Sequence, residues 1–257
     1  MIRCGLIFAF LVLSAALSPL AGALDLNGFK TKLNDLAKPA ASDSGSPAGS
    51  GLAQFSNKDQ VSGLKQALTQ GAEAAVSNLA RKDGYLGNDK VHIPLPDNLK
   101  KADKTLRRFG MGKYSDELIT SMNRAAEAAV PEAKTLLVGA VKKMTVADAK
   151  SILTGGDDAA TLYFRKNTET ALAGKFKPIV GKAMHKVKLA ETYDQFAGKG
   201  AKFGLLDERD AKLDDYITRK AMDGLFLMMA EQEKAIRVNP LQATGDLAKK
   251  IFSAIKL

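Results

Sequence analysis

Residues 213–237 read LDDYITRKAMDGLFLMMAEQEKAIR and carry the strongest helical pattern of the chain. Apolar and small residues recur there at spacings of three or four, which places them on one face of a helix. They are Leu213, Ile217, Ala221, Gly224 and Met228. The run 225–229 (LFLMM) is apolar on every side, which predicts burial all round. We therefore expect a long central helix near the C-terminus, ended by Asn239 and Pro240.

Shorter helical patterns precede and follow this stretch. Ser56 and Thr145 each stand three residues before an aspartate, Asp59 and Asp148, as helix-starting residues do. Alanine, leucine and lysine are abundant and tryptophan is absent, which favours helix over strand. The sequence thus predicts one all-α domain over residues 52–257, with Pro178 and the glycines after it punctuating the segments before the central helix.

Residues 84–96 (GYLGNDKVHIPLP) are the least helical part of this domain. Two glycines and two prolines forbid a continuous helix there. Val91, Ile93 and Leu95 alternate with polar residues or proline. We therefore expect this segment to lie extended across the body of the protein.

The N-terminus has the organisation of a secretory signal peptide. A positive residue, Arg3, precedes an apolar run over residues 5–17, and the small residues AGA follow at 21–23. The alternative is a membrane anchor, but roughly 13 apolar residues cover about 20 Å of a bilayer core of about 30 Å. Cleavage after Ala23 would leave no transmembrane anchor, and the protein would be periplasmic or secreted. Residues 24–51 are then a short amphipathic helix and a linker rich in Pro, Ala, Ser and Gly.

The formal net charge of +10 suggests an anionic neighbourhood: anionic lipid, a polyanion or an acidic envelope partner. Between Glu169 and Glu191 there is no acid, and five lysines form a candidate surface for binding an anionic partner: Lys175, Lys177, Lys182, Lys186 and Lys188. A second basic run covers residues 100–113. Aromatic interleaving is missing, so no nucleic acid is expected as a partner. The alternative for both runs is a solvated face that serves solubility.

Several kinds of catalytic site are not indicated. The two histidines, His92 and His185, are far apart and have no cysteine nearby, so no zinc-ligand spacing exists. Nucleotide-binding glycine motifs, a nucleophile elbow and an EF-hand loop are also missing. We expect no metal and no cofactor, although a site built from carboxylates alone stays open.

Three polar constellations are candidate ligand-binding sites. The first is Asn123, Arg124 and Glu127, which share a helix face among alanines. Alanines let neighbouring backbones approach and could bury these polar groups, which then need partners. A ligand could be that partner, and an internal network between helices is the alternative.

The second constellation is Asp157 and Asp158 with Arg165, which could bind a cation or share acid and base roles. Capping of the helix that follows is the alternative for the two aspartates. The third contains Asp215 and Arg219, at a favourable spacing of four, where the central helix begins. These side chains could line the mouth of a pocket, and a surface ion pair is the alternative.

Five motifs occur in order: residues 84–88 (GYLGN), 91–96 (VHIPLP), 121–129 (SMNRAAEAA), 152–160 (ILTGGDDAA) and 213–231. Together they resemble an exported bacterial family, domain-of-unknown-function family 4197, from residue 52 to the C-terminus. The resemblance implies an all-helical domain in the envelope of Gram-negative bacteria. It supplies no activity and no catalytic residues that could be transferred to this chain.

Two classes of function follow from these features. The leading hypothesis is a non-enzymatic protein of the periplasm or cell envelope that binds an anionic or amphiphilic ligand. The alternative is a carboxylate-based hydrolase that uses Glu127, Asp157 or Asp158. Acids that converge in a cleft would favour the enzyme, and dispersed acids with a basic surface would favour binding.

Overall fold

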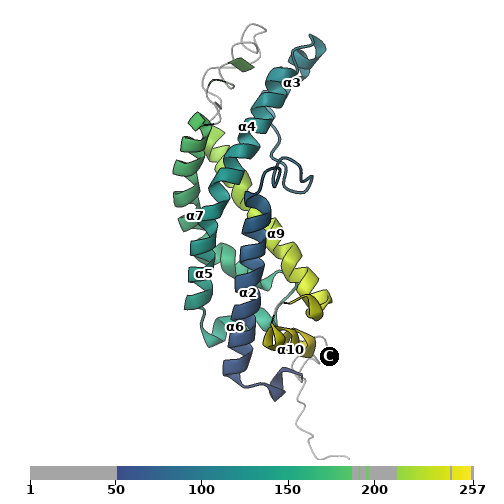
Figure 1. Ribbon diagram of the computed structural model, residues 1–257, viewed down its shortest axis with the longest axis vertical. Helices are drawn as coiled ribbons and strands as arrows, with labels where there is room; N and C mark the ends of the chain where they lie inside the picture. The colour runs from purple at the N-terminus through teal and green to yellow at the C-terminus, as the bar shows by residue number, and fades with distance from the viewer. Residues whose placement is uncertain (1–50, 187–190, 192–194, 197–212, 244, 256–257) are drawn as a thin grey trace, which may run out of the picture. The chain divides into compact units, whose positions relative to one another are not determined.

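Every regular element in the described part of the chain is a helix, which confirms the predicted all-α class (Figure 1). The computed structural model describes residues 51–186, 191, 195–196, 213–243 and 245–255. These residues all belong to one unit, Gly45–Leu257. Residues 1–50, which include the expected signal peptide, the amphipathic helix and all of the linker except Gly51, lie outside the described residues. Lys188 also lies outside them.

Three long helices and five shorter ones are described, with three 3-10 turns between them. The long helices are α2 (Asn57–Ala80), α7 (Ala159–Lys186) and α9 (Leu213–Val238). The shorter helices are α3 (Asp97–Arg108), α4 (Lys113–Ala129), α5 (Ala133–Lys143), α6 (Val146–Leu153) and α10 (Asp246–Ile255). The turns are η2 (Leu52–Gln54), η3 (Val130–Glu132) and η4 (Pro240–Gln242).

The predicted central helix is α9, which contacts α2, α4, α7 and α10 and packs most extensively on α7 (Figure 1). Leu225 and Phe226 are buried at its middle. Leu227, however, is 42% exposed, so the prediction of burial on every side is wrong at that position. The packed helices cover only part of the circumference of α9, and one apolar side chain of the run is left facing water.

Two predicted helix starts are confirmed in atomic detail. The Ser56 side chain accepts a hydrogen bond from the Asp59 N–H at 3.1 Å. Thr145 and Asp148 form a complete capping box, in which each side chain accepts from the backbone N–H of the other residue. Both caps satisfy N–H groups that have no partner inside their helix.

Helix α7 continues through Pro178, which corrects the prediction that this proline interrupts the helix. A proline inside a helix leaves the carbonyl four residues earlier without its usual donor. Here that residue is Gly174, and both Gly174 and Pro178 are exposed. Water can therefore hydrate the carbonyl, and the glycine has no side chain to crowd the proline ring.

No helix of the described ranges is both long enough and apolar enough to cross a membrane.

Candidate functional site

The segment between α2 and α3, residues 81–96, holds two of the sequence motifs and is the least regular part of the described body. It is not helical, as predicted, and its alternating residues Val91, Ile93 and Leu95 are buried together with Tyr85. A buried backbone without helical hydrogen bonds needs other partners for its N–H and C=O groups. Polar side chains of α4 supply them, and these are the residues of the first predicted constellation.

Glu127 binds the beginning of this segment. Its Oε1 accepts from the backbone N–H of Tyr85 at 3.1 Å and of Leu86 at 3.3 Å. Its Oε2 pairs with Arg124 at 2.6 Å, and the same guanidinium donates to Asp83 at 2.7 Å. Asp83 has a positive φ of 64°, a conformation that this ion pair helps to hold. Both oxygens of the buried carboxylate are therefore bonded to the chain itself.

Asn123 binds the other end of the segment. Its Oδ1 accepts from the Ile93 N–H at 2.9 Å, and its Nδ2 donates to the Ile93 carbonyl at 2.9 Å and to the Ile119 carbonyl at 2.8 Å. The buried amide thus replaces the backbone partner that Ile93 would have in a sheet. The first constellation is an internal network that fixes residues 81–96 on α4.

Replacing Asn123 with alanine will leave the buried N–H and carbonyl of Ile93 without partners. We expect the free energy of unfolding to fall by about 2 kcal/mol or more, since each unsatisfied buried group costs about 1–3 kcal/mol. Urea denaturation followed by circular dichroism measures this loss. Asn167→Ala is the matched control, because this exposed asparagine also donates to a carbonyl four residues earlier, that of Tyr163. Asn167→Ala should change the free energy of unfolding by no more than about 0.5 kcal/mol. An equal loss in both variants would contradict the role of Asn123 in fixing residues 81–96 on α4.

Helix α9 also holds this segment. The Tyr85 hydroxyl donates to the Ala221 carbonyl at 2.7 Å, and Tyr216 donates to the Pro94 carbonyl at 2.9 Å. Burial, with a smaller contribution from the Glu127 charge, raises the pKa of Tyr85 well above its ordinary value, so this hydroxyl stays protonated. A Cβ on Gly224 would lie 2.8 Å from the Tyr85 ring, so glycine is needed for this close approach.

The second constellation is not assembled as a unit. Asp157 and Asp158 are exposed in the turn before α7, whereas Arg165 lies further along that helix. The Arg165 guanidinium pairs with Glu169 at 3.1 Å and Asp223 at 3.6 Å, and it lies 4.5 Å from the centre of the Phe226 ring. Arg165 therefore joins α7 to α9.

The third constellation also joins helices. Asp215 pairs with Lys177 of α7 at 2.6 Å, and Asp214 lies 3.8 Å from the same ammonium group. The Arg219 guanidinium lies 5.8 Å from the centre of the Tyr216 ring. Lys177 is thus partly neutralised, which separates it from the other candidate lysines of α7.

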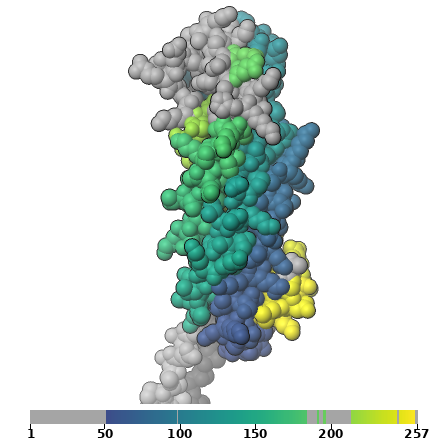
Figure 2. All heavy atoms as spheres, turned by 60° about the vertical axis from the view of Figure 1, so that its left-hand side comes forward, coloured from purple at the N-terminus to yellow at the C-terminus, as the bar shows by residue number. Residues whose placement is uncertain are grey.

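Helix α7 runs along the face shown in Figure 2, where it is coloured green. Lys175 and Lys182, seven residues apart on this helix, are exposed and form no ion pair within the described residues. Lys186 is the last residue of α7. The predicted anion-binding surface therefore has at least two exposed cations on one side of the helix.

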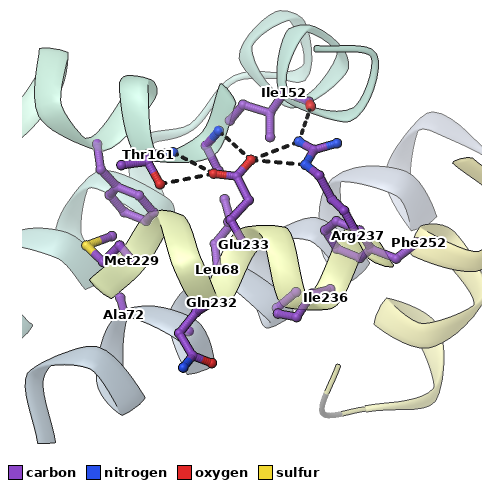
Figure 3. A pocket seen from close by; sticks show the side chains of 14 residues that line it. Leu68, Ala72, Ile152, Thr161, Met229, Gln232, Glu233, Ile236, Arg237 and Phe252 are labelled. Carbon is purple, nitrogen blue, oxygen red and sulfur yellow. Dashed lines mark hydrogen bonds and ion pairs between the residues drawn. The ribbon is translucent and has the colours of Figure 1, made fainter. Parts of the chain in front are cut away.

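A buried network that the sequence analysis missed is centred on Glu233 of α9 (Figure 3). Its carboxylate accepts from the backbone N–H groups of Ala160 and Thr161, both at 2.9 Å, and from the Thr161 hydroxyl at 3.0 Å. Arg237 donates to the same carboxylate at 2.9 Å and to the Ile152 carbonyl at 2.8 Å. Glu233 caps α7 from another helix and takes the role expected of Asp157 or Asp158.

The sequence feature that could have indicated this network is the spacing of four residues between Glu233 and Arg237. Acid and base four residues apart on a helix are typical of an exposed ion pair. Asp103 and Arg107 of α3, also four residues apart, form such an exposed ion pair at 2.7 Å. Sequence spacing alone does not distinguish the buried pair from the exposed one.

The cavity beside Glu233 is small. It lies among α2, α7, α9 and α10, is lined mainly by apolar side chains, and has a volume of about 30 Å³. This is room for one or two water molecules. The Glu233 carboxylate has its donors within the protein, and the cavity is too small for an organic substrate.

Two open clefts are larger, and each is lined by lysine without any carboxylate among its described residues. The first, about 350 Å³, lies between α5 and α7 and has Lys143 with Thr135, Tyr163 and Asn167. The second, about 340 Å³, lies at α10. Lys249, Lys250, Phe55, Leu241, Gln54, Ser253 and Ala254 line it. Both clefts suit an anion better than a cation, and the second also offers apolar contacts.

Within the described residues, no group of three or more histidine, cysteine, aspartate or glutamate side chains is placed to hold a metal ion. Glu127 and Glu233 are each bonded to their own backbone and arginine partners, and Asp157 and Asp158 are exposed. The described acids therefore do not converge on a shared cleft.

Comparison with known proteins gives one relationship. Neither a curated protein nor a solved structure matches the chain. A family model described as "Protein of unknown function (DUF4197)" matches residues 54–253. This range includes the non-helical segment 81–96, the buried networks of Glu127 and Glu233, and all of the described helices α3 to α9. The chain therefore belongs to this family.

Proposed function

We propose that the protein is exported to the cell envelope and there binds an anionic or amphiphilic ligand without catalysing a reaction. The observation that carries this proposal is the separation of charges. The buried carboxylates, Glu127 and Glu233, accept hydrogen bonds from the chain itself, whereas exposed lysines line the clefts and α7. These two buried carboxylates are thus engaged within the fold, whereas both of these clefts present lysine to a ligand.

This arrangement favours binding over the hydrolase alternative. A general acid or base must reach the proton that it transfers. Glu127 is buried and held by two backbone N–H groups and Arg124. Asp157 and Asp158 are exposed at the start of another helix, and none of the three acids lines the cavity or either of the two clefts described above.

Export rests on residues 1–23, whose order of a positive residue, an apolar run and small residues is that of a signal peptide. We expect the mature chain to begin at Leu24. Intact-mass measurement of protein from the periplasmic fraction reads the N-terminus directly. Soluble cytoplasmic protein that still carries Met1 and the apolar run would contradict export.

The ligand itself is best sought by native mass spectrometry of protein purified gently from its own envelope. We expect a retained anionic or amphiphilic molecule, seen as an added mass that denaturation releases. A chain that retains nothing but turns over a panel of ester, glycoside and phosphate substrates would contradict the proposal. Loss of that turnover in Glu127→Gln or Asp158→Asn would then assign the protein to the hydrolase class.

A further inference from the structure

The cleft between α5 and α7 has the dimensions of a small-molecule site. The two helices lie against each other (Figure 1). The α5 wall of the cleft runs from Thr135 to Lys143, and the α7 wall runs from Tyr163 to Ala171. Each wall therefore covers about two turns, or about 12 Å of helix. Its volume of about 350 Å³ lies in the usual range for sites that bind small ligands.

Lys143 is the one charged side chain among the described residues that line this cleft. It is exposed at the end of α5 and makes no ion pair within the described part of the chain. Asp148 of α6 acts on the Tyr163 hydroxyl from outside the lining, but its carboxylate accepts hydrogen bonds in the capping box of Thr145. One cation without an acidic partner suits a ligand with one negative charge.

Three further groups of the cleft have unused hydrogen-bonding capacity. The Tyr163 hydroxyl donates to the Ala140 carbonyl at 3.0 Å, so its oxygen remains able to accept. Burial, with a smaller contribution from the Asp148 charge, raises the pKa of Tyr163, so this hydroxyl stays protonated. Asn167 donates one hydrogen to the Tyr163 carbonyl at 2.8 Å, which leaves its Oδ1 and its second N–H. The Thr135 hydroxyl can both donate and accept.

Gly139 forms an open floor between these polar groups. A Cβ at this position would have no atom of another part of the described chain within 4 Å. Glycine is a poor residue for the interior of a helix, and no close approach requires it here. Leu136, Ala140 and Ala171 add apolar surface around the glycine. The cleft thus combines a cation, paired donors and acceptors, and a flat apolar floor.

We propose that this cleft binds a sugar acid, which is a ring with several hydroxyl groups and a single carboxylate. Lys143 holds the carboxylate, and Thr135, Tyr163 and Asn167 exchange hydrogen bonds with the hydroxyl groups. The C–H face of the ring lies on the floor at Gly139.

Other anions match the cleft less well. A fatty acid has no hydroxyl groups for the donors and acceptors, and a phosphate ester carries more negative charge than one lysine balances. The sugar acid rests on the proposed function and deepens it, because it names the class of anion and the cleft that takes it.

Ligand-observed NMR titration of the processed, purified chain tests the cleft, with D-glucuronate as the probe. We expect D-glucuronate to bind at least about tenfold more tightly than D-glucose, which lacks the carboxylate, and hexanoate, which lacks the hydroxyl groups. A lost hydrogen bond is worth up to about tenfold in affinity, and one to a charged group more.

Three results of this titration would overturn the sugar acid. Wild-type protein that does not bind D-glucuronate would do so, as would equal binding of D-glucose or hexanoate. Tighter binding of N-acetyl-dialanine than of D-glucuronate would overturn it in favour of a peptide carboxyl terminus.

Filling the floor tests the position of the site. Gly139→Leu places a side chain in the open space of the cleft and should weaken D-glucuronate binding at least about tenfold, while the better helix former keeps α5 folded. Gly181→Leu is the matched control, because Gly181 of α7 is also half-buried, has no atom of another part of the described chain near a Cβ, and does not line the cleft. Circular dichroism verifies that both variants fold. Unchanged binding by Gly139→Leu, or an equal loss in both variants, would overturn the assignment to this cleft.

The role of the cation is tested with two neighbouring lysines. Lys143→Gln should weaken D-glucuronate binding about 10–100-fold and leave D-glucose binding unchanged, because only the carboxylate meets the charge. Lys142→Gln makes the same change of net charge at an exposed residue that does not line the cleft, and it should retain binding. Equal losses in the two variants would mean a general charge effect and would overturn the site. A parallel loss of D-glucose binding in Lys143→Gln would contradict a contact with the carboxylate.

Failure of the sugar-acid site and failure of the proposed function give different results. Wild-type protein that does not bind D-glucuronate but retains another anionic molecule in native mass spectrometry would overturn the site alone. Wild-type protein that does neither, and turns over a substrate, would overturn both.

Discussion

Replacing Phe226 with alanine will lower the free energy of unfolding by about 3–5 kcal/mol, the usual range for a buried aromatic residue. The ring is 1% exposed at the middle of α9, and its face meets the Arg165 guanidinium of α7 at 4.5 Å. Truncation removes apolar contacts and leaves a cavity where the two longest helices pack. Phe226→Asp should not fold, because an unpaired charge would be buried there.

Leu227→Ala is the matched control for this prediction. It lies next to Phe226 in the same helix but is 42% exposed, so its truncation should cost less than about 1 kcal/mol. Chemical denaturation followed by circular dichroism measures both variants. A loss below about 1 kcal/mol for Phe226→Ala would show that α9 is peripheral and that the packing of α7 on α9 is not as described.

Features that depend on residues close in sequence could be predicted. The starts at Ser56 and Thr145 are set by a side chain and an N–H three residues away, so the sequence contains both partners. The length of α9 follows from its own periodicity, with Asn239 and Pro240 beyond its end. Local signals of this kind are sufficient for the all-α class.

Local rules failed where the surroundings decide. Pro178 was expected to interrupt a helix, but the exposed Gly174 carbonyl can be hydrated and α7 continues. Leu227 belongs to an apolar run, yet no helix covers it fully. The sequence around Pro178 does not differ from that of a proline that ends a helix, and Leu227 does not differ in sequence pattern from its buried neighbours.

The candidate site shows the same limit more strongly. Spacing correctly placed Asn123, Arg124 and Glu127 on one helix, but it could not say what they bind. The backbone groups of the non-helical segment that Glu127 binds lie 41 and 42 residues away along the chain, and those that Asn123 binds lie 30 residues away. The non-helical segment meets α4 only in the folded protein. Side chains whose spacing is compatible with a ligand site therefore bind the backbone of the chain itself.

Glu233→Ala will produce a loss comparable to that of Phe226→Ala, about 3–5 kcal/mol, because it removes one partner of a buried ion pair. Arg237 would keep its charge in a buried site, where its side chain is 9% exposed. The N–H groups of Ala160 and Thr161 would also lose their acceptor at the start of α7. Denaturation in urea, followed by circular dichroism, measures the loss.

Glu231→Ala is the control on the same helix, since its ion pair with Lys90 is exposed and should contribute no more than about 1 kcal/mol. The double variant Glu233→Ala with Arg237→Ala separates the two parts of the effect. If the unpaired arginine charge dominates, the double variant will be less destabilised than the sum of the single variants. If the α7 amides dominate, the losses will add. Equal and small losses for Glu231→Ala and Glu233→Ala would mean that Glu233 is hydrated rather than buried, and that α7 is not capped by α9.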